Sequence, residues 1–479
     1  MIGGAGRPRA GAAALAAVSA AVYATLALLR LRTFRSGTYD LVIFDQAVRS
    51  YSRFHLPVAM VKGVHNGFGP DFSVLGDHFS PILALLAPLY WIHDGPGTLL
   101  AAQAVLLALA VLPIWAFAAR RLGERAAGLL AAAYALSWPV AEAVAFDFHE
   151  AAFVPLLSAL LVERHDAGRR GQAAAAAVLL LLVKEDMGLL VAGFGLVLLA
   201  RRGARREGAA YAAAGLAWTA VASRLLIPAF GGREDYYWAY GSYGPDLPHA
   251  VLHLLTHPWE GFAGLADPPV KLWTMALLVL PFLLLPLASP LTLMVLPMLA
   301  ERMLADRFAN WWEPRYHYNA FLVAVLVMAA ADALDRWGGR APRLRGLAPP
   351  AMLAAAAATV PFFGFAQLWN PDLYHRSDRA RAAAEAVARV PDGAVVEASN
   401  RLGPALSGRT GVLLLDHRPR GAPWVVADER VRQFPFATVD EQRARIAALV
   451  AAGYRQVFRE GGYVVLHGPD TRGGPPLPG

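Results

Sequence analysis

Long apolar runs alternate with short polar segments over most of the chain. The first run, residues 10–29, is twenty residues long and carries no charged side chain, which is the length that an α-helix needs to cross the ~30 Å hydrocarbon core of a bilayer. Further candidate spans lie at 98–119, 126–141, 151–162, 173–183, 187–200, 208–228, 272–287, 288–300, 318–331 and 347–366. The pattern predicts an all-α polytopic membrane protein with about 11 transmembrane helices, the first of them uncleaved.

One apolar run does not fit this series. Residues 79–92 (FSPILALLAPLYWI) number only 14, which is short for a membrane-spanning helix. A span at this position would also move the next arginine-rich loops to the opposite side of the membrane. We therefore expect a re-entrant or interfacial helix here, within a large first loop at 31–97.

Arginine clusters set the expected orientation. With the N-terminus in the cytoplasm, four short loops that carry arginines fall on the cytoplasmic side, as the positive-inside rule requires. These arginines are Arg120, Arg121, Arg125, Arg164, Arg169, Arg170, Arg201, Arg202, Arg205, Arg206, Arg336, Arg340, Arg343 and Arg345. The loop at 31–97 and everything after the last span are then extracytoplasmic.

The pattern changes after Trp369. The segment 377–390 has the spacing of an amphipathic helix, whereas 394–398, 410–416 and 424–428 have the pattern of short buried strands. A capping box at Thr438 and Glu441 precedes another helix, and 456–467 is typical of a β-hairpin. We predict a transmembrane domain at 1–368, a small extracytoplasmic α/β domain at 369–470, and a disordered tail at 471–479.

Composition supports this class. Hydrophobic residues make up 57% of the 479 residues and charged residues only 17%, too little charge to cover the surface of a soluble protein. Only 3 of the 44 basic residues are lysines, and the arginines lie in short loops, so the net charge of +8 does not indicate nucleic-acid binding. The absence of cysteine excludes disulfides, thiolate metal sites and cysteine nucleophiles.

Two carboxylates lie just beyond the first predicted span, in the segment GTYDLVIFDQAVRS. Asp40 and Asp45 are five residues apart. A carboxylate at a membrane surface can act as a general base toward a bound hydroxyl. Helix capping and solvation at the end of the span are the structural alternative for each of them.

Two further motifs place acidic residues beside histidine in predicted extracytoplasmic segments. GDHFSP contains Asp77 and His78, and FDFHE contains Asp147, His149 and Glu150. These residue types bind a phosphate or substrate, or hold a divalent cation through oxygen and imidazole ligands. A hydrogen-bond network that anchors the ends of spans would use the same residues.

The segment LLLLVKEDMGLL interrupts more than twenty apolar residues with Lys184, Glu185 and Asp186. Ionisable groups at that depth are costly and usually face a protein interior or an aqueous cavity. A tight turn between two spans is the alternative. Arg315 and His317, in WWEPRYHYNAF, are further candidates for substrate binding, although the aromatic residues around them are also typical of an interfacial belt.

The motifs YDLVIFDQA, GDHFSP, FDFHE and LLVKED together resemble an uncharacterised family of bacterial predicted membrane proteins, which is similar in turn to the type C glycosyltransferases. This resemblance implies a multi-pass protein of the bacterial inner (plasma) membrane that moves a sugar from a polyprenyl-phosphate donor to a glycan, lipid or protein acceptor. It also implies that Asp40 is the catalytic carboxylate, with Phe44 as the aromatic residue four positions on. Many type C enzymes have Glu directly after this Asp, whereas this chain has Leu41, so Asp45 is an alternative.

Two other classes of function remain open on the sequence. A transporter or flippase for a lipid-linked or anionic solute would use the buried charges to line its path. A non-enzymatic envelope scaffold would use the C-terminal domain to recruit a partner. Beyond a divalent cation, the sequence suggests no cofactor.

Overall fold

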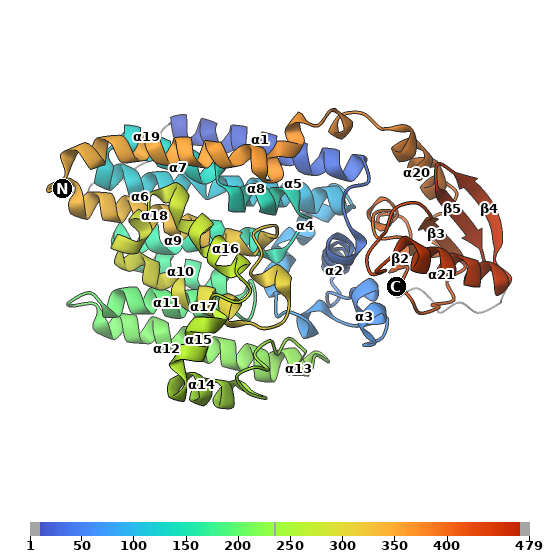
Figure 1. Cartoon of the computed structure of the whole chain (residues 1–479), viewed down its shortest axis with the longest axis horizontal. Helices are drawn as coiled ribbons and strands as arrows, with labels where there is room; N and C mark the ends of the chain where they lie inside the picture. The colour runs from blue at the N-terminus through green and yellow to red at the C-terminus, as the bar shows by residue number, and fades with distance from the viewer. Residues whose placement is uncertain (1–9, 234–235, 470–479) are drawn as a thin grey trace.

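The computed structural model describes residues 10–233 and 236–469, so the tail predicted at 471–479 lies outside the described residues. A bundle of helices occupies most of the molecule, and a small domain with a β-sheet lies at one end of it (Figure 1). The first-loop helices α2 (Ile43–Ser52) and α3 (Met60–Asn66) lie between the bundle and this domain.

Within residues 10–233 and 236–469, four helical segments are long and apolar enough to cross a membrane. They are α1 (Ala10–Arg32), the pair α5–α6 (Pro96–Leu122), the segment Arg205–Ala229 that begins with α12 (Arg205–Val221), and the segment His317–Gly338 that contains α18 (Ala320–Gly338). A fifth candidate is the pair α7 (Glu124–Leu136) and α8 (Trp138–Ala145), which is bent by 41°. The count of about 11 spans therefore remains a prediction.

The other predicted spans correspond to shorter helices or to helices with polar ends. These helices are α9 (Phe153–Asp166), α10 (Arg170–Leu181), α11 (Met187–Leu199), α16 (Val270–Val279), α17 (Leu296–Leu304) and α19 (Pro342–Thr359). Between α16 and α17 the chain forms short 3₁₀ turns, and Leu283 and Leu284 have φ angles of 56° and 59°. A non-glycine residue in this left-handed region ends a helix, so the apolar stretch 272–300 is not continuous.

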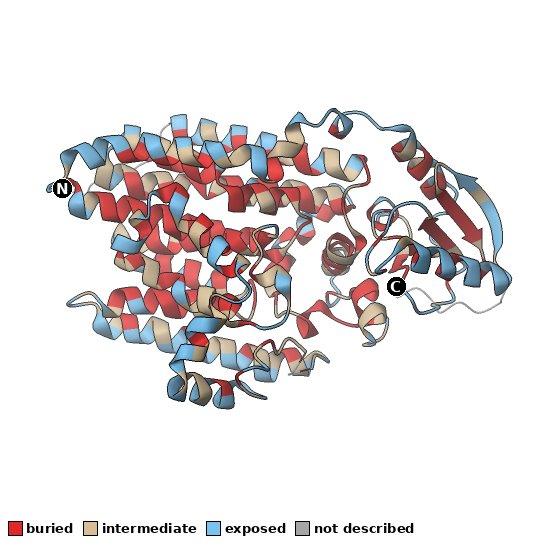
Figure 2. Cartoon of the chain, in the orientation of Figure 1, coloured by how far each residue is buried: buried red, intermediate tan, exposed pale blue. Residues whose placement is uncertain are grey.

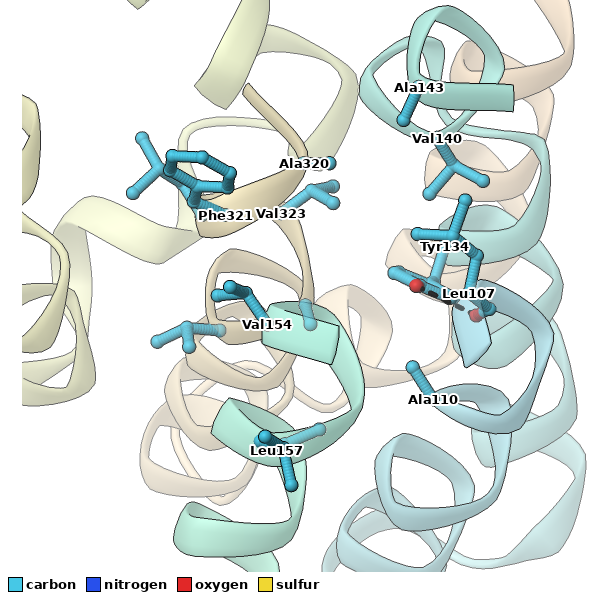
Figure 3. Close-up of a cluster of buried hydrophobic side chains, with 14 of the residues drawn as sticks. Leu107, Ala110, Tyr134, Val140, Ala143, Val154, Leu157, Ala320, Phe321 and Val323 are labelled. Atoms are coloured by element: carbon cyan, nitrogen blue, oxygen red, sulfur yellow. Dashed lines mark hydrogen bonds between the residues drawn. The ribbon is translucent and has the colours of Figure 1, made fainter. Parts of the chain in front are cut away.

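Helix α18 lies at the centre of the bundle. Of its apolar stretch, 94% is buried, and buried residues fill the interior of the bundle while exposed ones lie on its outer helices (Figure 2). Ala320, Phe321 and Val323 of this helix belong to the same hydrophobic cluster as Val154 of α9 and Val140 of α8 (Figure 3). The polar hydroxyl of Tyr134 is satisfied in this core by donating to the carbonyl of Leu107, at 3.0 Å.

The arginine-bearing loops meet at the end of the bundle farthest from the β-sheet. Arg121 contacts Asp166 at 2.5 Å and the buried Asp332 at 3.1 Å, and Arg120 contacts Glu163 at 2.5 Å. Helices α5 and α6 run from this cluster to Asp94, which pairs with Arg49 of the first loop at 2.6 Å. The two ends of the bundle thus carry separate charged clusters.

The C-terminal part of the chain contains α20 (Asp378–Ala388), α21 (Val439–Ala451) and a mixed sheet of order β2-β1-β3-β5-β4. Its strands are β1 (Val395–Ala398), β2 (Gly411–Leu414), β3 (Trp424–Asp428), β4 (Arg455–Glu460) and β5 (Tyr463–His467). Strand β1 is parallel to β2 and β3, whereas β5 is antiparallel to β3 and β4. Thr438 caps α21 by accepting from the backbone N–H of Glu441 at 3.1 Å, and the Glu441 carboxylate accepts from Ala437 at 3.0 Å, as the capping box predicts.

The first loop and the β-sheet share a hydrophobic core. Ile43 and Ala47 of α2 and Val61 of α3 are buried in one cluster with Leu406 and Val412 of the C-terminal part. The run at 79–92 forms a 3₁₀ helix (Pro81–Leu86) followed by α4 (Ala87–Tyr90), and Trp91 and Ile92 after it are exposed. The first loop is therefore a packed layer between the bundle and the C-terminal domain.

Candidate functional site

Asp40 lies in a π-helix (Thr38–Val42) that begins six residues after the end of α1 at Arg32. Its side chain is 33% exposed, and Oδ1 lies 3.5 Å from Nε2 of His149. Burial among other groups raises the pKa of Asp40 to about 7; the negative charge of Asp147 adds to this effect, and the ammonium of Lys62 opposes it. Asp40 is thus an accessible carboxylate that exchanges a proton near neutral pH.

Two distant segments fix the turn that carries Asp40. Asp147 Oδ2 accepts from the backbone N–H of Gly37 at 2.7 Å. Asn400, in the loop after β1, accepts through its side-chain oxygen from the N–H groups of Thr38 (2.9 Å) and Tyr39 (3.2 Å). These bonds satisfy donors that the first turn of a helix would otherwise leave unpaired. The position of Asp40 therefore depends on both the FDFHE segment and the C-terminal domain.

His149 and His317 form a stacked pair. Their ring centroids are 3.7 Å apart, with an interplanar angle of 26°, and Phe44 packs edge-on against His149 at 5.2 Å. Burial lowers the pKa of His149 to about 3, so its imidazole is neutral at physiological pH. The aromatic residue four positions after Asp40 thus orients the imidazole beside the Asp40 carboxylate.

A buried lysine lies on the first-loop side of the site. Lys62 is 3% exposed and its ammonium is 2.9 Å from Oδ1 of Asp77, which also accepts from the hydroxyl of Tyr237 at 2.7 Å. Burial opposes the charge on both groups, yet each partner stabilises the other's ionised form, so the pKa of Lys62 is raised and that of Asp77 is lowered. The rings of Tyr39 and Tyr236 lie 5.6 and 5.3 Å from the ammonium.

The GDHFSP and LLVKED segments are joined directly. His78 Nδ1 lies 2.8 Å from Oε1 of Glu185, whose other oxygen accepts from the N–H of Phe79 at 3.1 Å. Lys184 pairs with Asp186 at 3.0 Å. The charges interrupting the apolar stretch therefore form part of a polar cluster built by several helix ends.

The polar motifs predicted from the sequence lie in one region. The charges of Glu150 and Asp77 both act on Asp40, and the charges of His78 and Lys184 both act on Glu150. Five buried polar atoms here have no hydrogen-bond partner within the described chain: Asp147 Oδ1, His149 Nδ1, Glu150 Oε2, Asp186 Oδ1 and His317 Nδ1. Buried polar atoms are normally paired, and a cluster of unpaired ones is typical of a site that receives a polar ligand.

Asp45 does not belong to this cluster. Its carboxylate is fully buried and accepts from the hydroxyl of Tyr90 at 2.7 Å, from Nη2 of Arg49 at 2.8 Å, and from the hydroxyl of Ser407. These donors leave it enclosed and engaged, so the structure does not support the catalytic alternative proposed for Asp45. Its contacts link the first loop to the C-terminal domain.

Arg315 of the WWEPRYHYN segment, predicted to bind substrate, does not join the polar cluster. Arg315 is exposed, and within the described part of the chain no hydrogen bond or ion pair joins it to the other candidates. The segment is organised by Arg302, which is 2% exposed and donates to the carbonyls of Trp311 (2.8 Å) and Tyr318 (3.0 Å) and to Asn319 Oδ1 (2.9 Å). Arg302, Lys62 and Asn400 are among the residues that the sequence did not single out.

The predicted metal set does not converge on one point. Among residues 10–233 and 236–469, no three His, Asp or Glu side chains are grouped as ligands for one ion. Asp77 is already paired with Lys62 and Tyr237, and His78 is already paired with Glu185. These residues do not fit a divalent cation as they stand, and we assign no chemical step to one.

The fold is similar to that of two solved structures of ArnT. The structure is similar to ArnT from Cupriavidus metallidurans bound to undecaprenyl phosphate, with a TM-score of 0.57, 15% identity, and coverage of 98% of this chain and 100% of that chain. The apo state of ArnT gives a TM-score of 0.54 at 14% identity, covering 95% of this chain and 97% of that chain. A weaker likeness, with a TM-score of 0.42, 12% identity and coverage of 96% and 74%, is to the archaeal oligosaccharyltransferase AglB from Archaeoglobus fulgidus in complex with an inhibitory peptide and a dolichol-phosphate.

The family model of the predicted membrane proteins DUF2079 matches residues 30–465, and the chain belongs to this family. The matched range includes the first loop, the polar cluster and the β-sheet. No curated protein matches the chain.

Proposed function

We propose that the protein is an inverting glycosyltransferase that uses a polyprenyl-phosphate sugar as donor. The observation that carries the proposal is the position of Asp40, a partly exposed carboxylate with a pKa of about 7 beside a neutral imidazole. A general base is most effective when its pKa lies near the working pH. The fold shared with ArnT, whose structure contains undecaprenyl phosphate, supports the choice of donor class.

In the proposed reaction, the acceptor hydroxyl attacks C1 of the sugar while its proton passes to Asp40. The bond between C1 and the phosphate oxygen breaks, and the polyprenyl phosphate leaves with both bonding electrons. Attack and departure on opposite faces invert the configuration at C1. His149 is neutral and lies against the carboxylate, so its role is to orient Asp40 and the acceptor.

The departing phosphate needs cationic groups nearby. Lys62 and Lys184 are buried in the polar cluster, and each is kept charged by a neighbouring carboxylate, Asp77 and Asp186 respectively. We assign the phosphate contact to these lysines rather than to Arg315, which is exposed. The unpaired oxygen and nitrogen atoms of Asp147, Glu150 and His317 are available for the hydroxyls of the sugar.

The interior of the bundle favours an enzyme over a transporter. A transport path would need polar groups from one end of the bundle to the other. The central helix α18 is apolar and buried from Ala320 to Ala331, between the polar cluster at one end and Asp332 at the other. The two charged clusters are therefore separated by a packed core.

The test is a comparison of envelope glycans by mass spectrometry in cells that carry the wild-type chain, no chain, or Asp40→Asn. The amide keeps the size of the carboxylate but not its basicity. We expect a glycan that depends on the wild-type chain to be missing with Asp40→Asn at equal protein level in the membrane. A normal glycan profile with Asp40→Asn would contradict the proposal.

A further inference from the structure

A recess lies between the first loop and the C-terminal domain. It is a cavity of about 440 Å³, bounded by α2, by the stretch that leads from α2 to α3, and by residues 407–411. None of the residues that place Asp40, Lys62 or His149 lines it. Its volume is in the range of small-molecule and headgroup sites, which is ~300–1,000 Å³.

The wall is rich in hydrogen-bond donors. Among the described residues that line the cavity there are three arginines and one histidine, and no aspartate or glutamate. Arg49 is paired with Asp45 and Asp94, and Arg409 is paired with Asp392 at 2.8 Å. Arg53 differs, because within the described chain its exposed guanidinium makes no hydrogen bond or ion pair. Arg53 and His55 thus present cationic and donor groups at the rim without an acidic partner.

Exposed apolar side chains lie next to Arg53 and His55, outside the cavity wall. Phe54, between Arg53 and His55, is 86% exposed, and Ile92 is 85% exposed. Trp91 packs against Phe54 with ring centroids 5.9 Å apart and donates from Nε1 to the carbonyl of Ser52 at 2.8 Å. Aromatic and aliphatic groups beside arginine are typical of a surface that sits at the headgroup level of a bilayer.

Asp45 links the two walls of the cavity. Two of its three partners, Arg49 and Ser407, are wall residues, one from the first loop and one from the C-terminal domain. The buried carboxylate therefore fixes the spacing of the two walls. This contact gives Asp45 a role that does not involve the reaction at Asp40.

We propose that this cavity binds the anionic headgroup of a membrane lipid, with Arg53 and His55 contacting the headgroup and the acyl chains lying along Phe54, Trp91 and Ile92. The proposal is independent of the glycosyltransferase reaction, because the cavity and the Asp40 cluster share no side chain. The bound lipid would bridge the first loop and the C-terminal domain and stabilise their packing.

The test uses the purified full-length protein and native mass spectrometry with phosphatidylglycerol and with phosphatidylcholine of the same acyl chains. We expect preferential retention of phosphatidylglycerol, weakened about tenfold or more by Arg53→Glu, because a charge-assisted contact is replaced by repulsion. Arg381→Glu is the matched control, since Arg381 is an exposed arginine of α20 that does not line the cavity. Equal retention of the two lipids, or equal loss in both variants, would overturn the proposal.

Two further measurements do not depend on how well a variant folds. A photoactivatable phosphatidylglycerol should label wild-type peptides from residues 46–60 or 407–411, and labelling confined to other peptides would refute the site. Millimolar inorganic phosphate should leave lipid retention unchanged. Complete displacement by phosphate would show a site for free phosphate and would refute the lipid as its occupant.

Discussion

Asn400 of the C-terminal domain accepts three hydrogen bonds from Thr38: its backbone oxygen accepts from the Thr38 hydroxyl and from the Thr38 N–H, both at 2.6 Å, and its side-chain oxygen accepts from the same N–H at 2.9 Å. The two residues are 362 positions apart in the chain. Gly403 packs so closely on Thr38 that an added Cβ would lie 2.1 Å from the Thr38 hydroxyl oxygen. The C-terminal domain thus forms one wall of the turn that carries Asp40.

This contact predicts that Asn400→Ala lowers turnover, although Asn400 does not touch the reacting atoms. The variant leaves the N–H group of Tyr39 without its side-chain acceptor, whereas the N–H of Thr38 keeps the backbone oxygen of Asn400 at 2.6 Å. Leaving the Tyr39 donor unpaired costs about 1–3 kcal/mol of folding free energy. Hydrogen exchange should rise in the peptide that contains residues 37–42. Asn370→Ala, which removes an exposed cap on Asp372, is the control and should change neither turnover nor that peptide. Equal effects of the two variants would contradict a positioning role.

Asp40 and Asp45 should respond in opposite ways to the same substitution. Asp40→Asn should not lose thermal stability, and it should lose turnover by about 10²-fold or more, because it removes the proposed base. Asp45→Asn should unfold at lower temperature, because a fully buried carboxylate would no longer compensate the charge of Arg49. The measurements are turnover at saturating donor and the thermal unfolding midpoint. Loss of turnover at unchanged stability in Asp45→Asn would move the base to Asp45.

The pKa of Asp40 makes a prediction about pH. A base acts in its deprotonated form, so activity should rise with pH and level off above about 7. Stability should change in the opposite direction to activity. The pKa of Asp40 is higher in the folded state than in the unfolded state, so the free energy of unfolding falls as the pH rises from 3.8 to about 7. Asp40→Asn should therefore gain stability relative to wild type over this interval. An activity profile that is flat from pH 5 to 8 would contradict the assignment.

The C-terminal elements were predictable from the sequence because their signals are local. The strands β1, β2 and β3 lie where short buried runs were expected, and the capping box marks the start of α21. The span count was not predictable in the same way. An apolar run of 10–16 residues is compatible with a membrane span, a broken span or a short buried helix. Pro281 and Pro286 flank the turns at Leu283 and Leu284, but hydropathy alone does not register them as breaks.

The site was predictable as a set of motifs but not as a set of roles. Asp45 and Asp40 look equivalent in the sequence, and they are separated by tertiary contacts such as the one between Asp45 and Ser407, across 362 positions. Lys62 lies in a short helix with no charged neighbour of its own, and its partner Asp77 is on another turn of the first loop. The one sequence feature that could have drawn attention to Lys62 is the rarity of lysine, since the chain has only three. Pairings of this kind are set by tertiary packing and cannot be read from spacing.

The Lys62–Asp77 pair allows structural and functional contributions to be separated. Lys62→Met should cost about 3–5 kcal/mol, because it leaves Asp77 buried without its cation. The double variant Lys62→Met/Asp77→Asn removes both charges and should recover most of that stability. If Lys62 also contacts the donor phosphate, the double variant should still bind undecaprenyl phosphate more weakly than wild type. Wild-type binding by the stable double variant would assign Lys62 a structural role alone.

The last prediction concerns orientation. The arginine-bearing loops gather at one end of the bundle, around Arg120 and Arg121, and the β-sheet lies at the other end. Because short loops rich in arginine remain in the cytoplasm, the C-terminal domain and the Asp40 cluster should face the extracytoplasmic side. Alkaline phosphatase is active only outside the cytoplasm, so it should be active when fused after residue 479 and inactive when fused near Arg205. A reporter that is active in the cytoplasm, such as green fluorescent protein, should give the converse pattern. The opposite result would place the proposed active site in the cytoplasm, where an extracytoplasmic acceptor could not reach it. The glycosyltransferase reaction proposed for Asp40 would then need an acceptor on the cytoplasmic side.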